Sequence, residues 1–217
     1  MLQLNNYFSL KIKKQLSSIY SSISTGNTQV SVTIGNVKSI NVYITGNVTW
    51  PGTYTLSSLS TVYNALYACS GPTSSGSLRN IKVMRGGKEI TSVDLYTFLT
   101  SGNLSNNISL QDQDVIYVPA YDIRVSIDGA MKRPGVFEMK QGETLKDLIS
   151  YAGGFTENAY QNRITVQRTT EKEKSVADVS NDLYGMFPLQ TGDQFVVSEV
   201  LDRYSNRVKI FGGVFRP

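Results

Sequence analysis

The chain has 217 residues, a formal net charge of +4 and 18% charged residues, which is below the usual quarter. It contains one cysteine and no histidine, so an internal disulfide, a histidine metal site and histidine acid–base catalysis are excluded. No basic run interleaved with aromatic residues predicts a nucleic-acid surface, and no apolar run approaches the roughly 18 residues of a membrane span.

The first segment predicts a helix over residues 7–24, followed by a strand. Apolar residues recur at steps of four, four, three and four: Phe8, Ile12, Leu16, Ile19 and Ile23. This spacing places them on one helical face. Gly26-Asn27 is expected to end the helix, residues 30–34 alternate as a half-buried strand does, and Gly35-Asn36 fits a tight hairpin turn.

A repeat then dominates the chain. The stretch "VYITGNVTWPGTY", residues 42–54, is followed by "VSIDGAMKRPGVF" from residue 125 and "VKIFGGVFRP" at 208–217. The glycines Gly46, Gly129 and Gly212 are 83 residues apart, and prolines 51, 134 and 217 keep the same step. A fixed period of this length predicts two small domains and the start of a third. We therefore expect the chain to be a fragment of a longer protein.

Each full copy opens with a predicted β-hairpin. Gly46 and Gly129 lie inside alternating strands, which indicates a bulge or a close backbone approach. Pro51-Gly52 and Pro134-Gly135 predict type II turns, because proline pre-sets the second position and glycine accepts a positive φ at the third.

A helix is predicted after each hairpin. Apolar residues at i, i+3, i+4 and i+7 mark its buried face: Val62, Ala65, Leu66 and Cys69 in the first copy, and Leu145, Leu148, Ile149 and Ala152 in the second. Thr144 and Asp147 resemble a capping box at its N-terminus.

Three further strands complete each copy. Residues 80–85 and 163–168 alternate, residues 90–99 and 174–183 read as a short strand running into a loop, and residues 110–119 and 189–198 form the last strand. This order predicts an α+β fold in which one helix crosses a small mixed sheet, the β-grasp arrangement.

Taken together, these motifs resemble the soluble-ligand-binding β-grasp (SLBB) domain. Tandem domains of this kind are found in outer-membrane polysaccharide export proteins. The resemblance implies four parts: residues 1–41 as the tail of a preceding export domain, 42–120 and 121–205 as two SLBB domains, and 206–217 as the start of a third repeat.

Candidate ligand-binding residues are the aromatic and basic side chains at the hairpins and strand ends: Trp50, Tyr54, Arg85, Arg133, Phe137 and Arg168. Aromatic rings stack on sugars, and arginine binds anionic groups. The alternatives are structural, with the arginines paired to nearby acids and the aromatics packed at a core or domain interface. Asp112 and Asp114 suggest a cation site, but a turn before the last strand explains them better.

No catalytic constellation, metal site or cofactor is predicted. Cys69 lies on the apolar helix face, where a buried, inert thiol is expected, and no histidine exists to activate it. The chain is therefore not expected to be an enzyme.

The resemblance implies the periplasmic portion of a polysaccharide (capsule or exopolysaccharide) export protein, attached to the outer membrane through segments outside this chain. Its partners would be copies of itself in a ring, an inner-membrane polysaccharide co-polymerase and the polysaccharide chain, with no nucleic acid. The alternative is a glycan- or small-ligand-binding module of the cell envelope with no conduit role.

Overall fold

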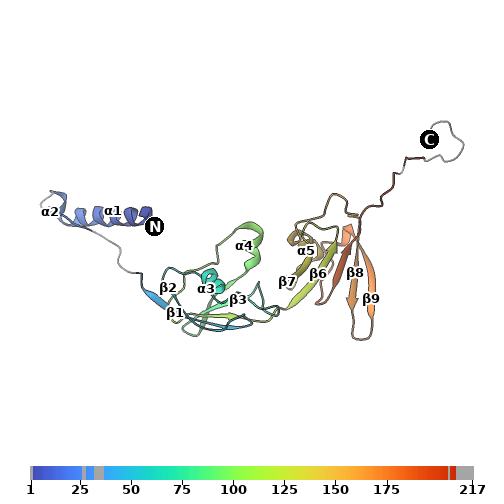
Figure 1. Ribbon diagram of the computed structural model, residues 1–217, viewed down its shortest axis with the longest axis horizontal. Helices are drawn as coiled ribbons and strands as arrows, with labels where there is room; N and C mark the ends of the chain where they lie inside the picture. The colour runs from blue at the N-terminus through green and yellow to red at the C-terminus, as the bar shows by residue number, and fades with distance from the viewer. Residues whose placement is uncertain (1, 26–27, 32–36, 205, 209–217) are drawn as a thin grey trace.

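The computed structural model describes residues 2–25, 28–31, 37–204 and 206–208 (Figure 1). Most of the predicted strand at 30–34, the turns at Gly26-Asn27 and Gly35-Asn36, and residues 209–217 of the predicted third repeat lie outside the described residues.

The N-terminal helix is longer than predicted and is interrupted. Helix α1 spans Leu2–Ile19 and α2 spans Ser21–Ser24, with Tyr20 in an extended conformation between them. The single helix predicted over 7–24 is therefore wrong in its bounds. Ile19 on the predicted apolar face is 70% exposed. None of the helices in the described part of the chain is both long and apolar enough to cross a membrane.

Two five-stranded sheets follow, and they have the same topology. The first has the order β2-β1-β5-β3-β4 and the second β7-β6-β10-β8-β9. The strands of the first are β1 (Ser39–Gly46), β2 (Gly52–Ser57), β3 (Ile81–Arg85), β4 (Lys88–Val93) and β5 (Val115–Val118). Those of the second are β6 (Ile123–Gly129), β7 (Gly135–Met139), β8 (Arg163–Thr169), β9 (Lys174–Ser180) and β10 (Gln194–Val197). In each sheet the first strand pairs antiparallel with its hairpin partner and parallel with the last strand.

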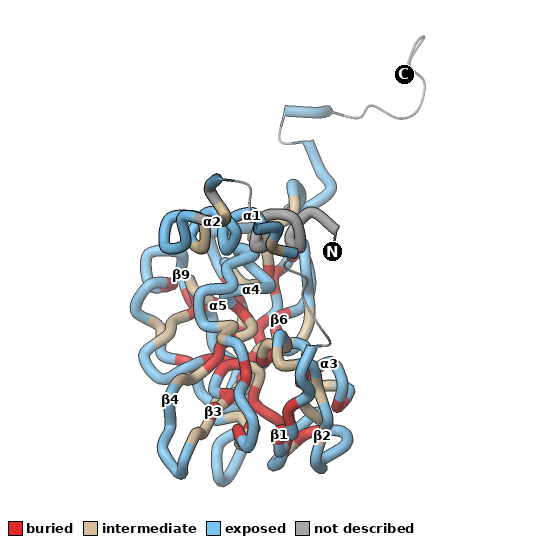
Figure 2. Tube along the Cα trace, turned by 90° about the vertical axis from the view of Figure 1, so that its left-hand side faces the viewer, coloured by how far each residue is buried: buried red, intermediate tan, exposed pale blue. Residues whose placement is uncertain are grey.

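Each sheet and its helix enclose a separate core. Helix α3 (Val62–Ala68) packs on the first sheet and α5 (Leu145–Tyr151) on the second. Ile44 and Ile116 are buried in the first core, and Ile127 and Phe195 in the second. Figure 2 colours the buried segments of the chain red. The α+β fold and the tandem β-grasp arrangement predicted from the repeat are confirmed. We refer to residues 39–118 and 123–197 as the first and second units.

The glycines inside the hairpin strands are required by close backbone contact. Gly46 and Gly129 have φ values of 91° and 87°. A Cβ atom on Gly46 would lie 2.2 Å from the carbonyl oxygen of Val118, and one on Gly129 would lie 2.1 Å from that of Val197. The first strand therefore meets the last strand at a point where only glycine fits, as predicted.

The predicted type II turns are wrong. Gly52 and Gly135 have φ values of 159° and 156°, far from the roughly 80° that the third position of such a turn requires. Both glycines are already the first residue of a return strand, and they pair with Ile44 and Ile127. The hairpin connection instead folds against the end of the helix, where Thr49 donates its backbone N–H to Gly71.

Helix α4 (Leu95–Ser101) was not predicted. Asp94 caps it by accepting a 2.9 Å hydrogen bond from the backbone N–H of Tyr96, and Gly102 ends it with a φ of 68°. The second unit has only a short 3₁₀ helix, η1 (Asn181–Leu183), after β9. The two units therefore differ most where α4 is added.

Candidate functional site

Two of the predicted site residues, Arg85 and Arg168, hold equivalent structural positions. The guanidinium of Arg85 donates to both carboxylate oxygens of Asp114 at 2.8 Å, and that of Arg168 donates to both of Asp193 at 2.7 Å. Both aspartates are buried. Each also accepts a backbone N–H from the turn before the last strand. These pairs fasten the last strand of each unit, which is the structural alternative considered above.

The hydrogen bonds to Asp114 and Asp193 raise the pKa of Arg85 and Arg168 respectively, so both stay charged. Asp112 accepts the backbone N–H of Asn41 at 2.8 Å. Within the described ranges, no group of three or more histidine, cysteine, aspartate or glutamate side chains is placed to hold a metal ion.

The remaining predicted residues are spread over the two hairpins. Trp50 is 65% exposed, and its carbonyl accepts a 2.7 Å hydrogen bond from the hydroxyl of Tyr54. Phe137 packs against the second core, and Arg133 is exposed. Ligand binding at these positions stays a prediction. Cys69 is buried, and this burial raises the pKa of its thiol.

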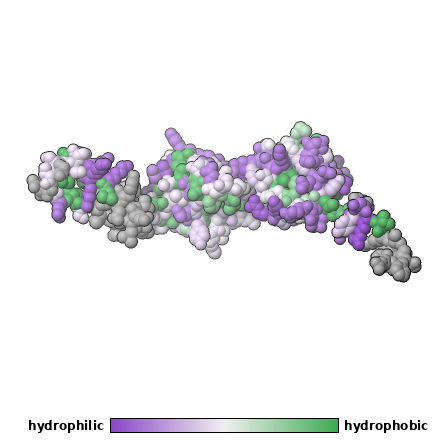
Figure 3. Space-filling view, turned by 90° about the horizontal axis from the view of Figure 1, so that it is seen from above, coloured by the Kyte–Doolittle hydropathy of each residue, from purple (hydrophilic) through white to green (hydrophobic). Residues whose placement is uncertain are grey.

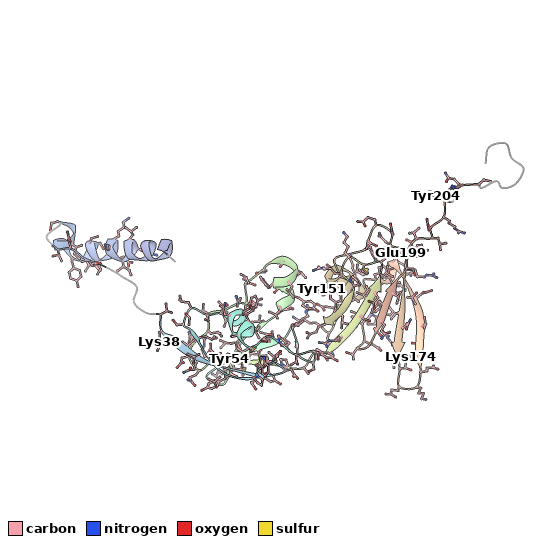
Figure 4. All side chains as sticks on the ribbon, viewed as in Figure 1. Lys38, Tyr54, Tyr151, Lys174, Glu199 and Tyr204 are labelled. Carbon is pink, nitrogen blue, oxygen red and sulfur yellow. The ribbon has the colours of Figure 1, made fainter. Side chains whose placement is uncertain are left out.

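The most elaborate polar cluster was not predicted, and it lies between the units. We call it the junction. Its side chains from the first unit are Ser77, Arg79, Asp94 and Tyr96, and those from the second are Glu138, Lys140, Glu143 and Tyr151. Figure 4 labels Tyr151, which lies on the side of the second unit that faces the first.

Arg79 is the centre of the junction. Its side chain is only 5% exposed. It donates to Glu143 at 2.6 and 2.8 Å, across the boundary between the units, and to Asp94 at 3.2 Å within its own unit. The guanidinium carbon lies 4.7 Å from the ring centroid of Tyr96 and 4.9 Å from that of Tyr151. Arg79 thus contacts two carboxylates and two aromatic rings, one of each from either unit.

Glu138 forms a second set of bonds across the boundary. Its carboxylate accepts the hydroxyl of Ser77 and the backbone N–H of Leu78, both at 2.6 Å. Its own backbone N–H donates to the hydroxyl of Tyr96 at 2.9 Å. Lys140 adds a 2.7 Å ion pair to Asp94. The loop before β3 and the start of α4 are therefore bonded directly to the second hairpin.

The electrostatics of the junction favour the charged forms. Burial opposes ionisation of Arg79, but its hydrogen bonds to Glu143 and Asp94 outweigh burial and raise its pKa. Burial would likewise raise the pKa of both acids. Hydrogen bonds from Lys140 and Arg79 nevertheless lower the pKa of Asp94, and those from Arg79 and the backbone of Lys140 lower that of Glu143. Undocking the units would break the pairs of Arg79 with Glu143 and of Lys140 with Asp94, and would leave Arg79 paired with Asp94 alone.

A comparison between repeats is the signal that could have located the junction. At a step of 83 residues, Arg79 corresponds to Asn162. Val93 and Val179 pair with equivalent isoleucines of β3 and β8, so Asp94, which follows Val93, corresponds to Ser180. Glu143 and Tyr151 correspond to Ser60 and Ala68. The junction is therefore built from positions at which the copies differ, whereas the strand-fastening arginines are the same in both.

An apolar groove lies beside the junction, between α3 and α4. Its volume is about 620 Å³, and its lining includes Tyr63, Leu66, Tyr67, Phe98 and Leu99. The rings of Tyr63 and Phe98 are 5.2 Å apart between centroids, and Tyr67 is 89% exposed. Hydrophobic residues gather over the first unit in the view from above (Figure 3). The second unit has no helix equivalent to α4, only the short 3₁₀ helix η1, so this wall of the groove is specific to the first unit.

Two β-grasp units with one topology, joined through buried charges, define a tandem-repeat scaffold. The chain belongs to the SLBB domain family: residues 40–118 match the SLBB domain, and so do residues 124–178. Two Escherichia coli proteins, each named "Polysialic acid transport protein KpsD", are 27% identical to this chain over 212 residues. The alignment covers 96% of this chain and 35% of each relative, so the chain spans about a third of their length.

Proposed function

We propose that this chain is the periplasmic portion of a polysaccharide export protein, in which it serves as an assembly and conduit-forming module. The tandem SLBB domains and the similarity to a polysialic acid transport protein support a role in polysaccharide transport. The observation that carries the structural part of the proposal is the junction, because its buried charges hold two units in one orientation.

A fixed orientation matters for a conduit wall. Single units of about 80 residues bury only about 60–65% of their unfolded surface, so they gain stability by packing against a neighbour. The ion pair of Arg79 with Glu143 and its cation–π contact with Tyr151 form only when the units are docked. Rigidly joined repeats can be placed side by side around a closed ring without changing shape.

The partners proposed for this module follow from the same role. They are other copies of the chain in the ring, an inner-membrane polysaccharide co-polymerase that delivers the polymer, and the polysaccharide itself. We propose no catalytic activity, and the transported polymer would pass without bond cleavage.

A second candidate function is favoured by the groove between α3 and α4. Its aromatic rings could stack on the apolar faces of sugars, as in a glycan-binding module without a conduit role. In that case a single copy of the chain would suffice.

The full-length protein distinguishes the two functions. Its mass is measured in detergent by light scattering, and surface polysaccharide is measured in cells that produce either the unaltered protein or Arg79→Met. The conduit role predicts a closed oligomer, and less surface polysaccharide with the variant. A monomeric full-length protein that binds glycan, and loses binding on Tyr67→Ala, would replace the conduit with the binding role.

A further inference from the structure

The far end of the second unit repeats the backbone of the surface that forms the junction on the first. In the first unit, Gly76 bridges to Ala120, and Ser77 donates its backbone N–H to Pro119 at 2.8 Å. In the second unit, Ala159 bridges to Glu199, and the backbone N–H of Tyr160 donates to Ser198, again at 2.8 Å. These pairs stand at equivalent places in the repeat. We call this second surface the far face, residues 158–163 and 198–203.

The junction surface of the first unit is covered by the second unit, whereas the far face of the second unit is open in the described part of the chain. On the first unit, Ser77 and Leu78 are bonded to Glu138 of the next hairpin. The far face instead borders an open hollow of about 600 Å³, lined by Tyr160, Arg163, residues 198–201 and Arg203. Figure 4 labels Glu199 here, where the chain leaves the second unit on the side away from Tyr151.

Apolar side chains of the far face are exposed. Val200 is 57% and Leu201 67% exposed, and both are next to the hollow. Arg203 occupies the place that Arg124 occupies after the first unit. Arg124 stacks on Tyr121 and donates to the carbonyl of Ser74, which fastens the connecting segment to the first unit.

The course of the chain indicates what covers the far face. A hollow of about 310 Å³ lies at the junction, and the connection after the first unit lines it with Ala120 and Asp122. The chain then enters the hairpin that docks there. Residues 198–201 and Arg203 line the far hollow in the same way, and residues 208–217 then repeat the sequence of the first hairpin strand. Ten residues lie between Val118 and Gly129, whereas fourteen lie between Val197 and Gly212. Four more residues add little to the entropic cost of docking.

We propose that the far face docks a third β-grasp unit, the one that residues 208–217 begin. Asn162 replaces Arg79 here and Ser180 replaces Asp94, so this contact lacks the buried ionic centre of the junction. Val200 and Leu201 supply apolar area to it. Arg163, which forms an exposed 3.1 Å ion pair with Asp178, and Arg203 supply positive charge at the rim. The far face is thus the weaker joint of the two.

A second copy of the chain is a poorer occupant. The exposed hairpin of the first unit has Thr55 and Ser60 where the docking hairpin of the second unit has Glu138 and Glu143. It therefore offers no carboxylate at these places to the arginines of the far face.

Cysteine labelling tests the proposal. Leu201→Cys is made in a Cys69→Ala background, which is suitable because Ala152 holds the equivalent place in the second unit. The rate of maleimide labelling is compared between residues 1–217 and the full-length protein. We expect labelling to be about tenfold slower in the full-length protein, because a covered thiol reacts only when the contact opens. Val176→Cys, at a site on β9 that is 68% exposed, is the control and should label equally in both.

Two results would overturn the proposal. One is equal labelling of Leu201→Cys in the two proteins, which would leave the far face open. The other is protection that appears in residues 1–217 alone as the protein concentration rises, which would make the occupant a second copy.

Discussion

Replacing Arg79 with methionine should loosen the junction without unfolding either unit. Methionine keeps much of the apolar stem but removes the charge that Asp94 and Glu143 share. Arg79 is only 5% exposed, and the two acid side chains are 11% and 19% exposed. The charges left behind are therefore poorly solvated.

The loss in free energy of unfolding depends on which hydrogen-bond partners Asp94 and Glu143 keep in the variant. Removing one partner of a buried ion pair typically costs about 3–5 kcal/mol. Asp94 keeps its 2.7 Å contact with Lys140, and Glu143 keeps the hydroxyl of Tyr151 at 2.8 Å. Because these contacts remain, we expect the free energy of unfolding to fall by about 3 kcal/mol, the lower end of that range. Lys82→Met is the matched control: its pair with Glu89 is exposed on both sides, so the loss should stay under about 1 kcal/mol.

Two measurements check this prediction. Denaturant unfolding gives the change in free energy, and the distance between spin labels at Tyr67→Cys and Val176→Cys, in a Cys69→Ala background, gives the orientation of the units. The variant should show a broader distance distribution with unchanged far-UV circular dichroism. Adding Glu143→Gln to Arg79→Met should recover part of the loss, because it removes a stranded charge. An unfolding free energy within about 0.5 kcal/mol of the unaltered chain, with an equally narrow distance distribution, would refute the reasoning.

Three further predictions concern the units and the pH dependence of the junction. Gly129→Ala should lower the melting temperature far more than Gly192→Ala. Both glycines have left-handed φ values, which cost alanine about 1–2 kcal/mol. Only at Gly129 would the added Cβ atom also collide with a backbone oxygen. Leu148→Ala should cost about 2–5 kcal/mol in denaturant unfolding, because Leu148 is fully buried in the second core, and Ile149→Ala should cost less because Ile149 is only partly buried. The pKa values of Asp94 and Glu143 are lowered in the docked state, so their ionisation stabilises docking at pH values above about 4. This stabilisation is lost as the pH falls through the lowered pKa values of the two acids. The distribution of spin-label distances should therefore broaden in acid for the unaltered chain and change less for Arg79→Met.

The repeat made most of the fold predictable. Positions with the same structural role occur in both copies, so each copy gives independent evidence for that role. Gly46 and Gly129, for example, both predict a point of close backbone approach. The same holds for Arg85 and Arg168, whose pairing with a buried aspartate was one of the two interpretations open from sequence. The hairpin turn was mispredicted because Pro-Gly fits a type II turn locally, whereas contact with the end of the helix sets the conformation here.

Helix α4 escaped prediction for a different reason. It is seven residues long, and its stability depends on the Asp94 cap and on contacts of Tyr96 with the second unit. Short helices are marginal on local preference alone, so their presence is decided by tertiary packing. The junction was missed on the same grounds, since Arg79 and Glu143 are 64 residues apart and neither recurs in the other copy.

The differences between the copies carry the information about assembly. Residues that fasten strands or fill a core serve the same purpose in each unit, so they recur. Residues that join one unit to the next have different neighbours at each boundary, so they need not be the same in both copies. Arg79 and Asn162 hold equivalent places, yet one lies at the centre of a buried ionic cluster while the other lies on an open face. A tandem array built on this plan can combine one rigid joint with one looser joint without altering the unit itself. The position of flexibility along the array is then set by a few side chains at each boundary.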